Sequence, residues 1–349
     1  MVRIGLVGLG YWGPNLARIF GGLPNSQVTI CCDLDEGRLQ QMATRFRDLR
    51  TTNNLDEVLD ADRIDAVVIA TPTRTHHALA RRALERGLHT FVEKPLATSI
   101  AECEDLIALA EKKGVVLFVG HVFLYTAAVN KLKQLIASGE LGDLCYIASN
   151  RLNLGPVRSD VNALWDLAPH DISIILHLMG RTPVSASCQG LAFLNKNLHD
   201  VAVLTMHFEN GTMAVVHSSW LDPNKVRRMT LVGNKKMAVY DDVEPLEKIK
   251  IYDKGVEAPS YYDTFGEFHF SYRYGDTYSP RLLEIEPLKA ECQHFIECLL
   301  KHEQPRTDGY NGMEVVRVLE AADLSLHNGG ARVPLKPVNG NGILITSST

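Results

Sequence analysis

Three glycines near the start of the chain are spaced as GxGxxG. They are Gly8, Gly10 and Gly13, with Tyr11 and Trp12 among the residues between them, and they stand directly after an apolar run and before a helical stretch. The first glycine permits a tight turn, the second lets a pyrophosphate approach the backbone, and the third lets the helix pack on the strand. This context predicts a dinucleotide-binding loop rather than a similar turn that binds nothing.

An acidic residue follows at the distance that such a loop needs. Asp33 ends the second apolar run, 20 residues after Gly13. A carboxylate in this place accepts hydrogen bonds from the ribose hydroxyls. Asp35 and Glu36 add negative charge that would repel a 2′-phosphate, so the sequence favours NAD as the cofactor. Arg38 keeps NADP open as the alternative.

A short loop with Thr71, Pro72 and Thr73 ends the third predicted strand, and His76 follows it. Ligands of a doubly wound sheet lie outside the carboxyl ends of its strands, so we expect this loop to border the cofactor. His76 either faces the cofactor or caps the following helix, and the sequence leaves both readings open.

The fourth predicted strand ends in Glu93, Lys94 and Pro95. The same rule for parallel sheets directs Lys94 toward the place where a nicotinamide would lie, with Glu93 beside it. The alternative for Lys94 is an ordinary salt bridge to Glu93.

Asp166 precedes His170 by four residues at a predicted helix start. This spacing lets the carboxylate and the imidazole share one face, where the carboxylate orients the histidine and raises its basicity. Such a pair can take the proton of a substrate hydroxyl. The alternative is that Asp166 caps the helix and His170 fills a polar place in the core.

Strands and helices alternate over the first 122 residues, which is typical of a parallel sheet covered on both faces. The predicted strands are Val2–Val7, Val28–Asp33, Ile64–Ala70, His89–Glu93 and Val115–Val119. The predicted helices are Pro14–Phe20, Glu36–Phe46, Thr75–Arg86 and Ser99–Lys112.

The pattern changes after Gly120 to a mixture of helices and consecutive strands. Helices are predicted at Ala127–Ser138, Pro169–Met179, Leu288–Lys301 and Gly312–Leu326. Strands are predicted at Asp143–Arg151, Asp200–Phe208, Thr212–Trp220, Arg228–Val232, Met237–Tyr240 and Ile249–Asp253. The Asn-Gly pair at 210–211 favours a tight hairpin turn, so the second half is predicted to be α+β with a largely antiparallel sheet.

Composition excludes several classes of protein. The 349 residues, 46% of them hydrophobic, predict an ordinary globular chain of two domains or one large one. A net charge of −5 without a basic run argues against nucleic-acid binding. No apolar stretch approaches the ~20 residues that span a bilayer. Seven cysteines without a CxxC pair predict neither a disulfide framework nor a metal site, so we expect a reduced, cytoplasmic protein.

Taken together, these motifs resemble the Gfo/Idh/MocA family of oxidoreductases. The GxGxxG loop, Asp33, the Glu93-Lys94-Pro95 run and the Asp166–His170 pair carry the resemblance. It covers almost the whole chain, including the helix at 319–322 and the ending at 333–335. It implies an α/β fold: a Rossmann domain with a doubly wound parallel sheet over 1–122, and an α+β domain with a large, mostly antiparallel open sheet over 123–337, before a tail at 338–349. It also implies that Lys94 and His170 flank a substrate hydroxyl and that Asp166 supports the histidine.

Residues 153–166 resemble the nucleotide-sugar branch of this family, which includes UDP-N-acetylglucosamine 3-dehydrogenases. The branch implies NAD-dependent oxidation of the C3 hydroxyl of UDP-N-acetylglucosamine, for later amination in amino-sugar biosynthesis of the lipopolysaccharide or lipid A type. Arginines can pair with a diphosphate, amides can read the sugar, and an aromatic ring can pack on its face. The candidates are Arg151 and Arg158, Asn153 and Asn162, and Trp165 or Tyr125, each of which can also be an ordinary surface residue.

Other functions stay open at this point. An inositol or other sugar dehydrogenase, or a reductase of 3-keto nucleotide sugars, would use the same chemistry on a different substrate. A non-catalytic NAD-binding regulator would bind the dinucleotide without turnover, and the complete set of Lys94, Asp166 and His170 argues against it.

Eight aromatic residues crowd the segment 261–278. Phe268, Phe270, Tyr272 and Tyr274 alternate along the chain, so they would line one face of a strand. The segment either stacks on a uracil ring or forms a subunit interface. The family resemblance implies a homodimer or a homotetramer.

Overall fold

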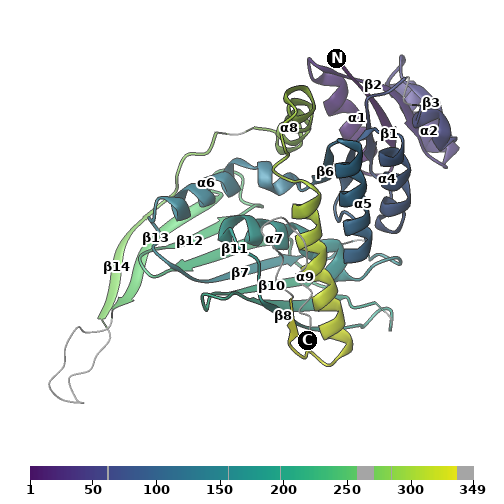
Figure 1. Ribbon diagram of the computed structural model, residues 1–349. Helices are drawn as coiled ribbons and strands as arrows, with labels where there is room; N and C mark the ends of the chain where they lie inside the picture. The colour runs from purple at the N-terminus through teal and green to yellow at the C-terminus, as the bar shows by residue number, and fades with distance from the viewer. Residues whose placement is uncertain (61–62, 156, 197, 258–270, 284, 336–349) are drawn as a thin grey trace, which may run out of the picture. The chain divides into compact units, whose positions relative to one another are not determined.

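The computed structural model describes residues 1–349 except 61–62, 156, 197, 258–270, 284 and 336–349 (Figure 1). The chain divides into two compact units: Met1–Thr126 with Ile285–Glu320, and Ala127–Glu284 with Ala321–Thr349. Each unit has its own sheet. The long helix α9 (Gly309–His327) continues across the division between residues 320 and 321.

The first unit contains a six-stranded parallel sheet in the order β3-β2-β1-β4-β5-β6. This is the predicted doubly wound arrangement, with the first strand at the centre. Its strands are β1 (Val2–Val7), β2 (Ser26–Cys32), β3 (Arg50–Thr52), β4 (Ala66–Ile69), β5 (His89–Glu93) and β6 (Leu117–Gly120). The carboxyl ends of β1, β2, β4 and β5 carry the predicted cofactor residues.

Helices cover this sheet, and α4 and α5 lie side by side on it (Figure 1). The helices are α1 (Gly13–Gly22), α2 (Glu36–Arg45), α3 (Leu55–Val58), α4 (His76–Glu85), α5 (Ile100–Lys113) and α8 (Pro287–Lys301), with 3-10 turns η1 (Thr73–Thr75) and η2 (Val122–Tyr125). The start of α5 is set locally, because Ser99 Oγ accepts a hydrogen bond from the backbone N–H of Glu102. The elements β3 and α3 were missed because they have three and four residues, too few to show a periodic pattern.

Helix α8 packs within the first unit although it lies far along the chain. Its Phe295 ring is 5.6 Å from the ring of Phe91 on β5 and 6.1 Å from that of Phe20 on α1, in edge-to-face contacts. The predicted division at residue 122, which assigned all later residues to a second domain, therefore differs from the observed one over Ile285–Glu320. Sequence periodicity identified the helix but not the sheet on which it packs.

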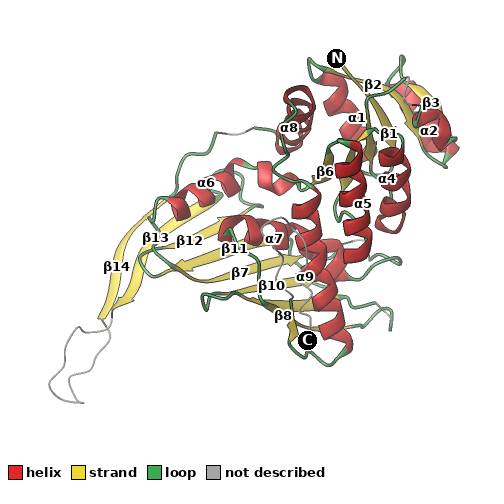
Figure 2. Cartoon of the chain, viewed as in Figure 1, coloured by secondary structure: helices red, strands yellow, loops and turns green. Residues whose placement is uncertain are grey.

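The second unit contains a nine-stranded sheet in the order β14-β13-β12-β11-β7-β10-β9-β8-β15 (Figure 2). Only β7 and β10 pair in parallel among its described neighbours, so the predicted, mostly antiparallel sheet is confirmed. Its strands are β7 (Leu144–Leu152), β8 (Ser185–Leu191), β9 (Val201–His207), β10 (Met213–Ser219), β11 (Val226–Gly233), β12 (Met237–Asp241), β13 (Ile249–Glu257), β14 (Ser271–Tyr278) and β15 (Val333–Pro334). The helices α6 (Ala127–Ala137) and α7 (Ala163–Met179) pack against each other, and α7 packs on β7, β9 and β10.

The aromatic segment is described only in part. The rings of Tyr272 and Tyr274 on β14 are exposed and stack with centroids 6.5 Å apart, as the alternation predicted. Residues 261–270 and the predicted tail at 338–349 lie outside the described residues. No described helix is both long enough and apolar enough to cross a membrane.

Candidate active site

The glycine loop connects β1 to α1 in the first unit. Gly8 has a φ of +95°, and a Cβ there would lie 2.6 Å from the carbonyl oxygen of Ala70. A Cβ on Gly13 would lie 2.2 Å from the carbonyl oxygen of Gly8, so both positions require glycine. A Cβ on Gly10 would meet no described atom within 4 Å, which leaves the backbone open to a close approach from outside. These features fit the predicted dinucleotide loop.

The side chain of Asp33 is hydrogen-bonded to the backbone of this loop. Its Oδ2 accepts a hydrogen bond of 2.6 Å from the backbone N–H of Leu9, and its Oδ1 accepts one of 2.9 Å from the backbone N–H of Asp35. The guanidinium of Arg38 lies 3.5 Å from Oδ2. The carboxylate is therefore fixed beside the loop, with one exposed cation next to it.

Tyr11 and Trp12 precede the first turn of α1. Tyr11 is exposed and Trp12 is half-buried, and their rings meet edge to face with centroids 5.4 Å apart. The carbonyl oxygen of Tyr11 accepts a hydrogen bond from Asn15 Nδ2. Both aromatic rings thus remain candidates for contact with a cofactor.

The loop after β4 is tied to the loop after β5 by His76. The histidine is buried, and its Nδ1 and Nε2 lie 2.8 Å from the carbonyl oxygens of Pro95 and Thr71, respectively. Thr71 also accepts a hydrogen bond from Thr75 Oγ1, and Pro72 and Thr73 begin the η1 turn. His76 thus joins two cofactor-side loops, which is a third role that the sequence did not suggest.

Ionisable side chains meet at the carboxyl ends of β5 and β6. Glu93 pairs in register with Gly120, where a Cβ would lie 3.1 Å from Glu93 Oε2. Burial raises the pKa of Glu93 to about 7, although the positive charge of Lys94 opposes the shift. His121 is also buried, and burial followed by the charge of Lys94 lowers the pKa of its imidazole to about 3. Lys94 itself is half-buried.

Glu291 on α8 adds a second buried carboxyl group to this region. Neither of its carboxyl oxygens has a hydrogen-bond partner in the described part of the chain. Burial, and after it the charge of Glu93, raises the pKa of Glu291 well above its ordinary value. Sequence reasoning missed both His121 and Glu291. The available signal was a glutamate one turn before Phe295, on the apolar stripe of its helix.

Tyr125 is packed inside the first unit. Its hydroxyl shares a hydrogen bond of 3.1 Å with Thr307 Oγ1, and the guanidinium of Arg306 lies over its ring at 5.2 Å. Phe118 stacks on the same ring. This corrects the prediction that Tyr125 packs on a sugar, because its faces and hydroxyl are occupied by protein.

The second unit presents the other predicted residues at the start of α7. The predicted start at Pro169 is wrong: the helix begins at Ala163, and Pro169 lies inside it. Asn162 caps the helix, because its Oδ1 accepts a hydrogen bond from the backbone N–H of Trp165 and its Nδ2 donates to Asp323. This corrects the prediction that Asn162 reads the sugar, since its buried amide is used for structure.

Asp166 and His170 lie one helical turn apart on α7, so they share a face as predicted. Asp166 Oδ2 accepts a hydrogen bond of 3.1 Å from the indole N–H of Trp220, and its Oδ1 accepts one of 3.3 Å from Arg158 Nη1. Sequence reasoning missed Trp220, which stands 54 positions away in the chain. The carboxylate of Asp166 is therefore held by two hydrogen-bond donors from outside its helix.

The two arginines proposed to bind a diphosphate are engaged with carboxylates. Arg151 is buried and pairs with Asp171 beneath α7. This corrects its predicted role, because a buried, ion-paired guanidinium does not reach a ligand. Arg158 is more exposed, but it donates to Asp160 over 2.9 and 2.7 Å as well as to Asp166. Arg158 therefore already faces two negative charges.

Asn153 and Trp165 flank this region. A Cβ on Gly155 would lie 2.4 Å from Asn153 Nδ2, so the amide packs over that glycine. Trp165 is half-buried in the first turn of α7. Both remain candidates for substrate contact.

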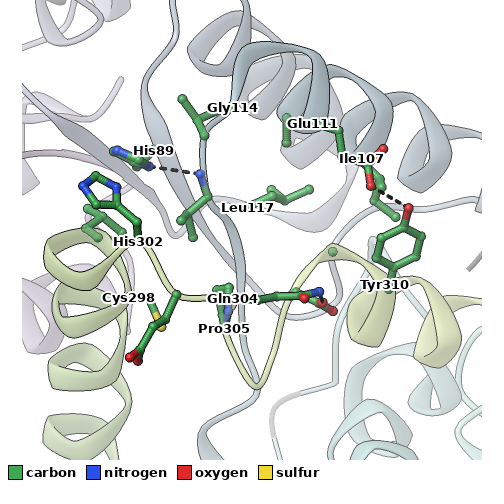
Figure 3. A pocket seen from close by; sticks show the side chains of 17 residues that line it. His89, Ile107, Glu111, Gly114, Leu117, Cys298, His302, Gln304, Pro305 and Tyr310 are labelled. Atoms are coloured by element: carbon green, nitrogen blue, oxygen red, sulfur yellow. Dashed lines mark hydrogen bonds between the residues drawn. The ribbon is translucent and has the colours of Figure 1, made fainter. Parts of the chain in front are cut away.

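A cavity of about 370 Å³ in the first unit lies at the amino-terminal ends of β5 and β6. The glycine loop, by contrast, follows the carboxyl end of β1. Figure 3 shows the start of β5 at His89, whose Nδ1 accepts from the backbone N–H of Val116, and Tyr310, whose hydroxyl donates to Glu111. Because ligands of such sheets bind at the carboxyl ends, this cavity is not the predicted dinucleotide site. Among the described residues, no group of three or more His, Cys, Asp or Glu side chains is arranged to hold a metal ion.

Comparison with protein-family profiles gives two matches. The profile described as oxidoreductase family, NAD-binding Rossmann fold, matches residues 2–121. The profile of the GFO/IDH/MocA C-terminal domain matches residues 129–239. The two matches follow one another along the chain, as the sequence resemblance predicted.

Individual relatives extend over nearly the whole chain. The UDP-N-acetylglucosamine 3-dehydrogenase of Acidithiobacillus ferrooxidans is 29% identical over 323 residues, which cover 92% of this chain and 95% of the relative. A solved structure of that enzyme, GnnA, has a TM-score of 0.80 at 27% identity and covers 94% of this chain and 98% of its own. The scyllo-inositol 2-dehydrogenase (NAD(+)) of Bacillus subtilis is 26% identical, covering 94% of this chain and 95% of the relative.

Proposed function

This chain belongs to the Gfo/Idh/MocA family of NAD-dependent oxidoreductases, and from that membership we propose that it oxidises the C3 hydroxyl of UDP-N-acetylglucosamine to a ketone. The observation that carries the proposal is the near full-length similarity to GnnA in both sequence and structure. The product would be a 3-keto nucleotide sugar that a later amination step could consume.

NAD, when bound, supplies the acceptor for the hydride that leaves the substrate carbon. The residues present fit it: the loop through Gly8 and Gly13 leaves an open backbone at Gly10, and Asp33 provides a fixed carboxylate for the ribose. The glycine loop ends at the amino terminus of α1, whose free N–H groups favour phosphate.

The proton of the substrate hydroxyl must leave together with the hydride. We assign its removal to His170, with Asp166 as the carboxylate that supports the imidazolium. We assign to Lys94 the stabilisation of negative charge on the substrate oxygen. Glu93, which is buried next to Lys94, has a raised pKa and so carries less than a full negative charge near neutral pH.

The test is production of NADH by the purified full chain with NAD and a panel of alcohols. The panel contains UDP-N-acetylglucosamine, UDP-glucose, free N-acetylglucosamine, myo-inositol and scyllo-inositol, and a ketone trap draws the reaction forward. We expect NADH with UDP-N-acetylglucosamine and a trapped product that NMR identifies as the C3 ketone. NADH with an inositol and none with any UDP-sugar would overturn the substrate assignment.

One observation favours a second candidate, the oxidation of an uncharged polyol. Arg151 forms a buried ion pair with Asp171, and Arg158 is paired with Asp160 and Asp166. Neither arginine therefore offers an unpaired positive charge to a diphosphate. An inositol carries no phosphate, and the scyllo-inositol 2-dehydrogenase is similar over nearly the same length. Inhibition by free UDP in competition with the sugar would favour the nucleotide-sugar substrate over the polyol.

A further inference from the structure

The buried side chain of Trp220 contacts the carboxylate of Asp166. Its indole N–H donates to Asp166 Oδ2 over 3.1 Å, and the side chain is 1% exposed. A buried indole usually finds one hydrogen-bond acceptor, and here the acceptor is the carboxylate that lies one turn before the candidate base on α7. The donor is neutral and shielded from water, so neither salt nor mild changes of pH would weaken this bond.

The same short segment anchors both partners of this bond. The carbonyl oxygen of His199 accepts a hydrogen bond of 2.9 Å from the backbone N–H of Ala163, the first residue of α7. The carbonyl oxygen of the next residue, Asp200, accepts one of 3.0 Å from the backbone N–H of Trp220. Two adjacent peptide groups therefore hold the start of α7 close to the residue that follows β10. This brings the indole N–H of Trp220 within hydrogen-bond distance of Asp166.

Arg158 is the contrasting partner of Asp166. Its side chain is 37% exposed, its contact with Asp166 is longer at 3.3 Å, and it makes two shorter bonds to Asp160. Because the Arg158 side chain is open to solvent while Asp166 is 20% exposed, salt partly screens this ion pair. The hydrogen bond from Trp220 to Asp166 is therefore shielded from solvent, whereas the one from Arg158 is accessible to it.

We propose that Trp220 is the positioning residue of the Asp166–His170 pair, holding the carboxylate in place, while Arg158 is an exchangeable partner. The proposal rests on the roles assigned above to Asp166 and His170 but not on the identity of the sugar. Loss of the indole N–H frees the carboxylate to rotate, so His170 loses part of the support that orients it.

Kinetics provides the first test, with whichever panel substrate is turned over. We expect Trp220→Phe to lower kcat by about 10-fold or more, in the range seen for loss of an orienting partner, with KM for NAD unchanged. Arg158→Gln should lower kcat by less than about 3-fold, as expected for a long contact with one solvent-exposed partner. Phe208→Leu, which removes volume from a buried ring next to β10 without touching Asp166, is the matched packing control. Equal losses of kcat in the Trp220 and Phe208 variants would overturn the proposal.

NMR titration of the histidines provides a second test that needs no substrate. The His170 signal is identified by its absence in His170→Asn. Asp166→Asn removes a negative charge and should move the titration midpoint of His170 to lower pH. We expect Trp220→Phe to move it in the same direction by a smaller amount. An unchanged midpoint in a folded Trp220→Phe protein would overturn the positioning role, whatever the substrate proves to be.

The wild-type chain supplies a further readout if the Trp220 variant fails to fold. Its three indole N–H signals are assigned by elimination with Trp12→Phe and Trp165→Phe. We expect the Trp220 signal to shift with pH at the same midpoint as His170, because Asp166 links the two groups. A Trp220 signal that does not respond to this titration would overturn the proposal.

Discussion

The backbone N–H of Leu9 donates a hydrogen bond of 2.6 Å to Oδ2 of Asp33, which joins the glycine loop directly to the end of β2. Arg38 lies 3.5 Å from the same oxygen. The carboxylate that we expect to bind the ribose hydroxyls therefore lies beside a cation that would attract a 2′-phosphate.

We expect Asp33→Ser to switch the cofactor preference of the enzyme from NAD to NADP. The loss of charged hydrogen bonds of about 1.5–3 kcal/mol corresponds to a fall of roughly 10- to 100-fold in kcat/KM for NAD. Arg38, relieved of its neighbour, should raise kcat/KM for NADP. Asp56→Asn, which removes an exposed carboxylate paired with Arg82 and Arg86, is the control and should leave the preference unchanged. An unaltered ratio of the two cofactors in Asp33→Ser would contradict this role.

Lys94 and His170 should be needed for turnover but not for NAD binding. We expect Lys94→Ala and His170→Asn each to lower kcat by about 10²- to 10⁴-fold, the usual contribution of a general acid or base. The affinity for NAD, measured by calorimetry, should stay within about 2-fold, since the glycine loop and Asp33 are intact. His77→Gln, which alters a histidine paired with Asp105 on the surface, is the control. Near-normal turnover in either variant would refute the assignment for that residue.

Glu291 should make the protein less stable as the pH rises. Its pKa in the folded state is raised well above the ordinary 4.5 by burial and by Glu93, so the folded protein keeps a proton that the unfolded chain releases. Stability is therefore full below about pH 4.5 and declines as the pH rises above it. We expect the Tm of Glu291→Gln to exceed that of the wild type by a margin that grows from pH 5 to pH 8. Glu286→Gln, at an exposed ion pair with Arg18, should show no such trend, and a margin independent of pH would refute the buried proton.

Arg151 should matter for folding. Arg151→Met leaves the buried carboxylate of Asp171 without its counter-charge, which costs about 3–5 kcal/mol of unfolding free energy. Arg151→Met combined with Asp171→Leu should recover much of the loss. Arg50→Met, which breaks an exposed pair with Glu57, should cost less than about 1 kcal/mol. Denaturant unfolding measures all three, and wild-type stability in Arg151→Met would contradict the structural role.

We expect the chain to self-associate through the face that carries Tyr272 and Tyr274. They are 66% and 76% exposed on β14, which is the end strand of its sheet. Exposed aromatic rings on an edge strand are typical of an interface. We expect a homodimer or homotetramer by light scattering, and a smaller mass for Tyr272→Ser with Tyr274→Ser. Leu246→Ser, at another exposed apolar side chain, is the control. A wild-type mass of 38.7 kDa would refute the prediction.

Features that depend on neighbours along the chain could be predicted from the sequence. The GxGxxG turn, the cap of α5 at Ser99, the hairpin at Gly211 and the shared face of Asp166 and His170 all follow from spacing within a few residues. The parallel sheet with helices on both faces was also predicted, because alternating strands and helices leave few other ways to bury the strands.

The partners of individual side chains depended on the tertiary structure. Arg151 was read as a ligand-binding cation, but β7 and α7 bring it against Asp171, and only the fold brings Trp220 to Asp166. Tyr125 was read as a sugar platform, yet residues 306 and 307 enclose it. The physical reason is that a charge or a ring pattern specifies what kind of partner a residue needs. Which of many equivalent partners it meets is decided by packing between segments that are distant along the chain.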